Sequence, residues 1–219
     1  MRINNNDDVL VAYRSDTTGT WGAKVYHWAQ DQWEIVDLDV VVDSSYLQMN
    51  DFMQVTVKTP TGAFRWDPPT ETAPNGTLVP IGPIGATGAG INNLGTVCGT
   101  IYAKPAKGPA NNYPFRFTTS LEVLFGQSGY GHAINSDSDL FVRTGDGTKN
   151  FVYQSTLGKF YDVDTLIDPN DPNAATWFNN VPSAVDMNDR GTNGFGQLTG
   201  RMHSAVNGAV WGAYLLTPQ

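Results

Sequence analysis

Short apolar runs alternate with polar turns along the whole chain, and one turn pattern recurs five times. In each copy an apolar residue precedes an Asn and a short polar residue follows it. The five copies are Ile3-Asn4-Asn5, Met49-Asn50-Asp51, Ile91-Asn92-Asn93, Ile134-Asn135-Ser136 and Met187-Asn188-Asp189. An apolar residue stands five positions after the Asn in four copies, and Asn193 takes that place in the last; the four are Val9, Val55, Val97 and Leu140. The pattern predicts a strand, a tight turn and a second strand.

The spacing of these turns indicates the fold class. Successive Asn residues are separated by 46, 42, 43 and 53 positions (4 to 50, 50 to 92, 92 to 135, 135 to 188). A period in the forties is typical of one four-stranded propeller blade. We therefore expect an all-β, five-bladed β-propeller of short antiparallel strands. It would form a single repeat domain over residues 1–219, with modules anchored near Asn4, Asn50, Asn92, Asn135 and Asn188.

The turn itself has a physical explanation. An Asn side chain can accept a hydrogen bond from the backbone two residues on, which forms an Asx-turn. The third residue after the Asn must then tolerate a left-handed backbone, which Gly and Asp do readily. The residues at that place are Asp7, Met53, Gly95, Ser138 and Gly191.

Each module continues with a second turn and an aromatic strand. The turns hold Thr18-Gly19, Thr61-Gly62, Gly108-Pro109, Asp146-Gly147 and Asn207-Gly208. The strands hold Tyr26-His27-Trp28, Phe64-Arg65-Trp66, Phe115-Arg116-Phe117, Phe151-Val152-Tyr153 and Tyr214-Leu215-Leu216. Alternation predicts that the outer two residues of each triplet share a face, with Trp28 and Trp66 in the core and His27 outward. Further strands are expected at residues 33–38, 78–81, 121–125 and 160–166, and loops at 67–76 and 168–180.

Net charge and cysteine content argue against several classes of function. The formal net charge is −8, with 13 basic and 21 acidic residues. This charge argues against sequence-independent binding of nucleic acid and against binding to an anionic membrane surface. The one cysteine, Cys98, allows no intramolecular disulfide and is expected as a small buried apolar residue. No apolar run is long enough for a membrane span. No signal region opens the chain, so it is either cytosolic or a processed form of an exported protein.

These residues resemble the HAF-repeat family of extracellular bacterial proteins. The closest copy is the stretch 78–99 with Ile91-Asn92-Asn93-Leu94-Gly95-Thr96-Val97-Cys98-Gly99, and the final Trp211-Gly212-Ala213-Tyr214-Leu215-Leu216 resembles the end of that family's repeat. The resemblance covers nearly the whole chain. It implies a propeller-like fold and an extracellular or cell-surface location, and it implies no activity. Both ends fall inside a module, so either upstream residues supply the missing strands or the open edges pair with a neighbouring molecule.

No metal or cofactor is predicted from the acidic clusters. The sequence Asn135-Ser136-Asp137-Ser138-Asp139 lacks the Gly and the closing Glu of a calcium loop and coincides with the repeated turn. A second cluster, Asp162, Asp164, Asp168 and Asp171, lies partly in an expected loop. His27 and His203 have no partner at metal-ligand spacing.

Candidate binding residues come from two places. The strand before each Asn would line a central channel, and there the polar or ionisable side chains are Gln48, His132 and Asp186. Hydrolysis of a glycoside needs two carboxylates facing one bond, and Asp186 is a single one. Trp21, Trp33 and Trp177 fall outside the buried register, and exposed aromatic rings bind sugars and protein surfaces.

The leading hypothesis is a non-catalytic, exported propeller-like protein that binds a surface glycan or protein, or that assembles with copies of itself. It needs no cofactor. The alternatives are a glycoside-acting propeller enzyme that uses Asp186 as one pocket carboxylate, and a purely structural self-assembling subunit.

Overall fold

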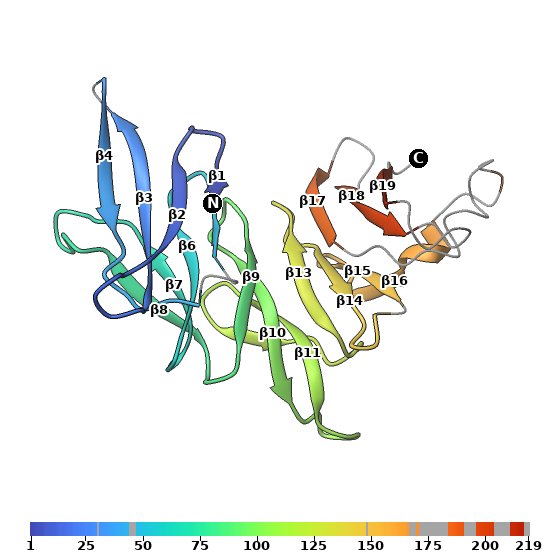
Figure 1. The fold of residues 1–219 in the computed structure, drawn as a ribbon. Helices are drawn as coiled ribbons and strands as arrows, with labels where there is room; N and C mark the ends of the chain where they lie inside the picture. The colour runs from blue at the N-terminus through green and yellow to red at the C-terminus, as the bar shows by residue number, and fades with distance from the viewer. Residues whose placement is uncertain are drawn as a thin grey trace. The chain divides into compact units, whose positions relative to one another are not determined.

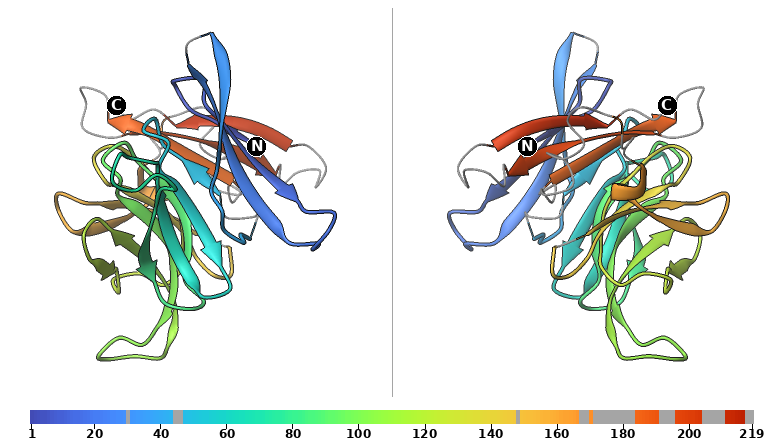
Figure 2. Two further views of the ribbon diagram at one scale, coloured as in Figure 1. Left: turned by 90° about the vertical axis from the view of Figure 1, so that its left-hand side faces the viewer. Right: turned by 90° about the vertical axis from the view of Figure 1, so that its right-hand side faces the viewer.

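A computed structural model describes residues 1–29, 31–43, 47–147, 149–166 and 170, together with the backbone of 184–190, 196–203 and 211–216. The loop predicted at 168–180 lies outside the described residues, except for residue 170. The described chain is all-β, as expected: it contains strands, one 3-10 turn of helix, η2 (Val163–Leu166), and no α-helix. In Figures 1 and 2 the strands follow one another in chain order within each sheet.

Four sheets have four antiparallel strands each, and each sheet is one module of the repeat. The first contains β1 (Arg2–Ile3), β2 (Val9–Arg14), β3 (Trp21–Ala29) and β4 (Gln32–Asp37). The second contains β5 (Gln48–Met49), β6 (Val55–Thr59), β7 (Gly62–Asp67) and β8 (Thr77–Gly82). The third contains β9 (Thr87–Ile91), β10 (Val97–Ala103), β11 (Asn111–Phe117) and β12 (Leu121–Val123). The fourth contains β13 (Tyr130–Ile134), β14 (Leu140–Arg143), β15 (Asn150–Gln154) and β16 (Lys159–Asp162).

The fifth module has three strands in the described residues, β17 (Ala184–Arg190), β18 (Gly196–His203) and β19 (Trp211–Leu216). Its Asn188 lies inside β17, at an irregularity in the pairing with β18 between Met187 and Arg190. The expected turn directly after Met187 is therefore wrong for this module, because the strand continues past the Asn.

In the other four modules the Asn turn has the predicted geometry. The Asn side-chain oxygen accepts a hydrogen bond from the backbone N–H four residues on, at 2.9 Å in every case; the donors are Asp8, Gln54, Thr96 and Asp139. The third residue after the Asn has a positive φ, between 58° and 73°, at Asp7, Met53, Gly95 and Ser138. The next strand begins at the residue after the donor in each case. The backbone N–H two residues on donates to the same oxygen at 3.0 Å from Asn6, Phe52 and Leu94. The Asx-turn is thus confirmed in the first three modules, and the strand starts are confirmed in all four.

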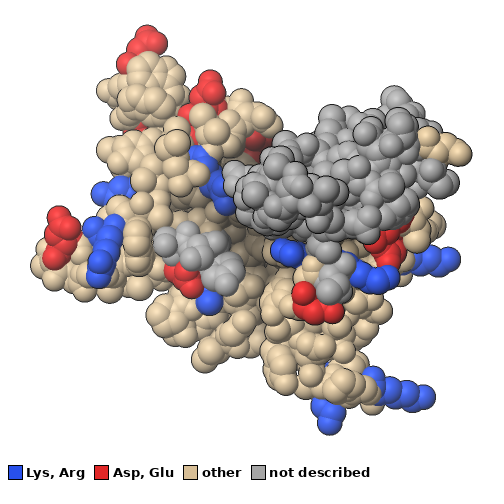
Figure 3. Space-filling view, turned by 45° about the vertical axis from the view of Figure 1, so that its right-hand side comes forward, with Lys and Arg blue, Asp and Glu red and all other residues tan. Residues whose placement is uncertain are grey.

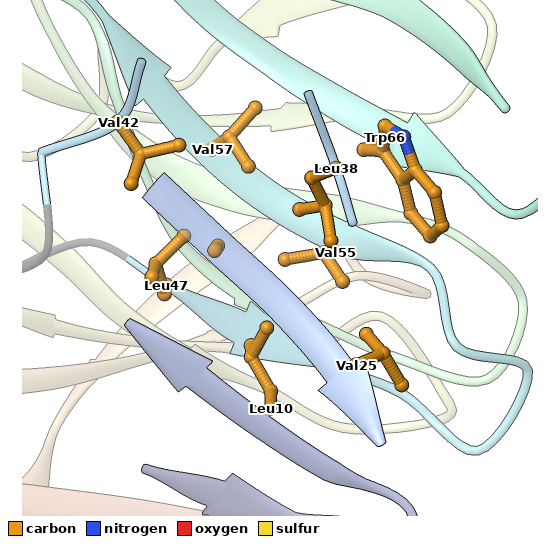
Figure 4. Close-up of a cluster of buried hydrophobic side chains, with 9 residues drawn as sticks. Leu10, Val25, Leu38, Val42, Leu47, Val55, Val57 and Trp66 are labelled. Atoms are coloured by element: carbon orange, nitrogen blue, oxygen red, sulfur yellow. The ribbon is translucent and has the colours of Figure 1, made fainter. Parts of the chain in front are cut away.

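The chain forms two compact units, which we describe separately. One comprises Met1–Tyr102 with Phe115–Glu122, and the other comprises Ala103–Pro114 with Val123–Gln219. In the first unit, the first two sheets share a buried core that Figure 4 shows in close-up. Leu10 and Val25 from the first sheet pack with Val55, Val57 and Trp66 from the second. At about 1.5–3 kcal/mol for each fully buried large apolar side chain, this cluster is a main source of stability in that unit.

The aromatic strands are confirmed, but their burial is only partly as expected. Phe115 and Phe117 are buried on either side of a half-buried Arg116, and Trp66 is fully buried. Trp28 is 48% exposed, so its assignment to the core is wrong. The buried face of β3 holds Ala23 and Val25, and strict alternation then puts His27 on that face and Trp28 on the other. His27 is accordingly half-buried rather than outward.

Candidate functional site

Two exposed tryptophans of the first unit, Trp28 and Trp33, lie on one face of the β3–β4 hairpin. The register pairs Trp28 with Trp33 and Tyr26 with Ile35, so these four side chains share a face because directly opposed residues of antiparallel strands project to the same side. The two tryptophan rings meet edge to face, with centroids 5.1 Å apart and planes inclined by 70°. Trp33 is 52% exposed and Ile35 is 58% exposed. We call Tyr26, Trp28, Trp33 and Ile35 the aromatic face.

A small polar cluster adjoins this face along the same strands. Lys24, opposite Asp37, lies 3.3 Å from its carboxylate, and the Tyr13 hydroxyl donates a hydrogen bond of 3.2 Å to the same carboxylate. The Lys24 ammonium also lies 4.9 Å from the centre of the Tyr13 ring. The hydrogen bond and charge of Asp37 raise the pKa of Lys24, and partial desolvation together with Asp37 raises the pKa of Tyr13. The cluster therefore has one cation balanced by one anion.

The predicted tryptophans do not form one site. Trp21 is 41% exposed at the start of β3, but it alternates onto the face of Ala23 and Val25, opposite to that of Trp33. Trp177 lies outside the described residues. The sequence reasoning missed Trp28 as an exposed partner of Trp33. The β3–β4 register would have revealed the pair, but it follows from the two-residue turn between Ala29 and Gln32 and not from the aromatic pattern.

The predicted channel residues lie on first strands, as expected. Gln48 is half-buried in β5, where its backbone N–H donates to Thr56 Oγ1 at 3.1 Å. His132 is exposed in β13 with its ring centroid 6.4 Å from that of Phe141. Neighbouring protein atoms and the charge of Arg143 lower the pKa of His132. Asp186 is in β17 opposite Thr199, and only its backbone is described.

Residues at the donor position of the Asn turn connect the turn to the third strand of the module or to the residue directly after that strand. Asp8 is buried and its carboxylate lies 2.5 Å from His27 Nδ1 in β3. Gln54 donates to Asp67 Oδ1 at 2.8 Å, and Asp139 accepts the backbone N–H of Ser155 at 2.8 Å. In three modules the side chain at this position thus makes an equivalent contact, so the Asp8–His27 pair has a structural role.

The two acidic clusters differ from a calcium site in their contacts. Asp139 is buried in the turn and its carboxylate also accepts a hydrogen bond from the Asn135 side chain. Asp162 forms an ion pair of 2.7 Å with Lys149, and desolvation together with the charge of Asp162 raises the pKa of Asp164. Asp168 and Asp171 lie outside the described residues. Over residues 1–166, the described part contains no group of three or more His, Cys, Asp or Glu placed to hold a metal ion.

Cys98 is confirmed as a buried residue of β10. Burial raises the pKa of its thiol to about 12, so the thiolate that a nucleophile requires is disfavoured.

Charged side chains of the described residues are dispersed on the face shown in Figure 3. Acidic and basic groups are both present there, separated by uncharged residues. The described residues contain no helix that is both long and apolar enough to span a membrane. No protein-family model matches the chain, and no curated protein matches its sequence.

Proposed function

We propose that this chain is a non-catalytic, exported, β-propeller-like protein whose five sheets are blades, and that it acts as a binding or scaffold protein for a surface glycan or protein or for copies of itself. The observation that carries the proposal is the aromatic face. Three of its side chains, Trp28, Trp33 and Ile35, are about half exposed or more. Large exposed aromatic residues are the side chains that dominate recognition surfaces.

Two features support the interpretation of the sheets as blades. Each sheet contains consecutive strands, as a propeller blade does. First strands of successive modules are also neighbours: β1 contacts β5 and β5 contacts β9 in one unit, and β13 contacts β17 in the other. First strands that follow one another around an axis are the inner strands of a propeller. The resemblance to HAF repeats supports the exported location.

Side-chain hydrogen bonds between successive Asn turns add to this support. Asn4 Nδ2 donates to the backbone oxygen of Asn50 at 3.1 Å, and Asn50 Nδ2 donates to that of Asn92 at 2.9 Å. One residue further on, the Asp51 carboxylate accepts from Asn5 Nδ2 at 3.0 Å and from Asn93 Nδ2 at 2.7 Å. We call these bonds the Asn ladder. A ladder that joins equivalent places in successive modules is expected of a repeat built for stacking.

The binding proposal is tested with immobilised bacterial surface polysaccharides and with Trp33→Ala and Ile84→Ala variants. Ile84 is 77% exposed in the turn after β8, outside the aromatic face, and serves as the matched control. We expect Trp33→Ala to weaken binding about tenfold, since a stacked ring contributes on the order of 1.4 kcal/mol, and Ile84→Ala to bind like the wild type. Release of reducing sugar by the wild-type chain would contradict the non-catalytic assignment.

A further inference from the structure

One tripeptide of the second module matches a motif for covalent modification. Among all Asn residues of the sequence, Asn75 alone is followed by a residue other than Pro and then by Ser or Thr, in Asn75-Gly76-Thr77. This pattern is the acceptor motif for N-linked glycosylation, which occurs on surface loops of secreted proteins. The motif lies between β7, which ends at Asp67, and β8, which begins at Thr77.

Short-range hydrogen bonds build the loop that carries the motif. Thr70 and Ala73 exchange backbone hydrogen bonds of 3.1 Å in each direction, and Thr70 Oγ1 accepts another from the Ala73 N–H at 3.1 Å. The N–H of Gly76 then donates to the Ala73 carbonyl oxygen at 3.0 Å, which closes a tight turn with Pro74 and Asn75 at its two central positions. All of these partners belong to the same loop, so the turn is a local structure of the second module.

The fold explains the glycine of the motif. Gly76 has a φ of 75°, and a Cβ atom there would lie 2.6 Å from the Asp67 carbonyl oxygen and 2.7 Å from the ring of the buried Trp66. Glycine therefore fits this place without displacing backbone or a core side chain, and a larger residue does not.

The fold does not explain the two residues on either side of that glycine. Asn75 and Thr77 are both exposed, and within the described residues neither side chain has a hydrogen-bond partner. Asn75 differs in this respect from Asn50, whose side chain bonds within its own turn and to the next module. A glycan attached at Asn75 would accordingly displace no contact of the fold.

We propose that Asn75 is an acceptor for an N-linked glycan, which is transferred from a sugar activated as a phosphate or diphosphate ester at C1. Asn75 Nδ2 forms a bond to C1 of the sugar, the bond between C1 and the phosphate oxygen breaks, and the phosphate leaves with the electron pair. The amide loses one proton to a base of the transferase, and Thr77 supplies the hydroxyl that the motif requires. The inference rests on the exported location in the proposed function, because the motif is modified in secreted chains.

An Asn–Gly pair has a second covalent fate, which the turn opposes. In deamidation the backbone nitrogen of Gly76 attacks the side-chain carbonyl carbon of Asn75, ammonia leaves, and water opens the resulting ring. In this turn the N–H of Gly76 is bonded to the Ala73 carbonyl oxygen, so the turn must open before the attack can occur. The folded protein thus preserves the amide that glycosylation requires.

Mass spectrometry of the full chain, secreted from a host that attaches N-linked glycans, tests the proposal. We expect a glycan on the wild-type peptide that contains Asn75, and complete loss of it in Asn75→Gln and Thr77→Ala. Thr77→Ser should retain the glycan because it keeps the hydroxyl. Thr72→Ala, which changes an exposed Thr of the same loop outside the motif, is the matched control and should retain it as well.

A wild-type chain secreted without a sugar on Asn75 overturns the proposal, and so does a glycan that Thr77→Ala leaves in place. The mass change of deamidation alone would mean that Asn75 reacts with its own backbone instead. Polysaccharide binding is measured separately, and Asn75→Gln should bind like the wild type because Asn75 lies outside the aromatic face. An unmodified chain that binds through Trp33 therefore refutes the glycan and leaves the proposed binding function standing, whereas a glycosylated chain that binds nothing does the reverse.

Discussion

At the scale of single residues, the Asn of the repeated turn satisfies several backbone and side-chain groups at once, as Asn50 shows. Asn50 accepts hydrogen bonds from the N–H groups of Phe52 and Gln54, and it donates to Gln54 Oε1 and to the Asn92 carbonyl oxygen. A single side chain therefore closes its own turn and joins it to the next module. Asp and Ser could supply the oxygen for the first task, but only an amide also has the N–H groups for the second.

Asp51 makes the Asn ladder sensitive to acid. Burial alone would raise the pKa of its carboxyl group, but hydrogen bonds from the backbone and side chain of Asn5 and from Asn93 outweigh that effect and lower the pKa below its usual value. A lowered pKa in the folded state means stability that is present above the unfolded-state pKa, about 3.9, and is lost as the pH falls through the folded-state value.

We therefore expect Asp51→Asn to be less stable than the wild type at pH 7 by about 1 kcal/mol. The difference should shrink as the pH is lowered from 5 towards 2, because the wild-type carboxylate is then protonated as well. Urea unfolding across this range measures it. Asp16→Asn, a change at an exposed carboxylate in the turn after β2, is the control, and a gap between Asp51→Asn and wild type that is independent of pH would contradict the account.

At the scale of elements, close packing of strands in the third sheet requires a glycine at position 99. A Cβ atom on Gly99 in β10 would lie 1.9 Å from the carbonyl oxygen of Thr87 and 2.8 Å from the Phe115 ring. The pairing of β10 with β9 shifts register between Cys98 and Gly99, which brings the backbones together at this point.

Gly99→Ala should accordingly destabilise the protein by more than about 3 kcal/mol or prevent folding, since backbone and a buried ring must move. Gly145→Ala is the matched control: its Cβ would meet nothing nearer than 3.8 Å, at the edge of Tyr130. Thermal unfolding followed by circular dichroism compares the two variants. Equal melting temperatures for both would show that the strands separate easily at Gly99.

Local sequence patterns predicted the strands and turns well, but they did not predict the contacts between strands or between modules. The Asx-turns and the strands that follow depend on residues within five positions of the Asn, so the sequence suffices to locate them. The placement of Trp28 failed because the counterpart of Trp66 in the first sheet is Tyr26, as the pairing of Val9 with Tyr26 and of Val55 with Trp66 shows. That register depends on turns whose lengths differ between modules.

Only part of the aromatic face could be predicted, and the reason differs from the one that applies to Trp28. Trp33 was identified as an exposed candidate, but the exposure of Ile35 depends on which sheets lie beside the first one. No pattern within a module contains that information, since the equivalent Phe160 has similar chemistry and is half-buried. The Asn ladder was likewise hidden, because its bonds connect residues 42 and 46 positions apart.

At the scale of the whole molecule, the Asn ladder should make neighbouring modules unfold together. Repeat proteins derive much of their stability from the interfaces between adjacent repeats, so a defect in one repeat weakens its neighbours. Asn50 occupies the middle of the ladder in the first unit, between the turns of Asn4 and Asn92. Its replacement by Ala removes a donor to the next turn and leaves buried backbone groups without their partner.

Asn50→Ala should lower the free energy of unfolding by about 2–4 kcal/mol, as expected for the loss of several buried hydrogen bonds. Amide hydrogen exchange of the same variant should accelerate at Asp8 and Thr96, whose N–H groups bond to Asn4 and Asn92, and not only at Gln54 in its own turn. Asn75→Ala, at an exposed Asn before β8, should change neither quantity by more than about 0.5 kcal/mol. Faster exchange confined to Gln54 and Phe52 would mean that each Asn serves its own turn alone, and that the bonds between turns add nothing to the cohesion of the modules.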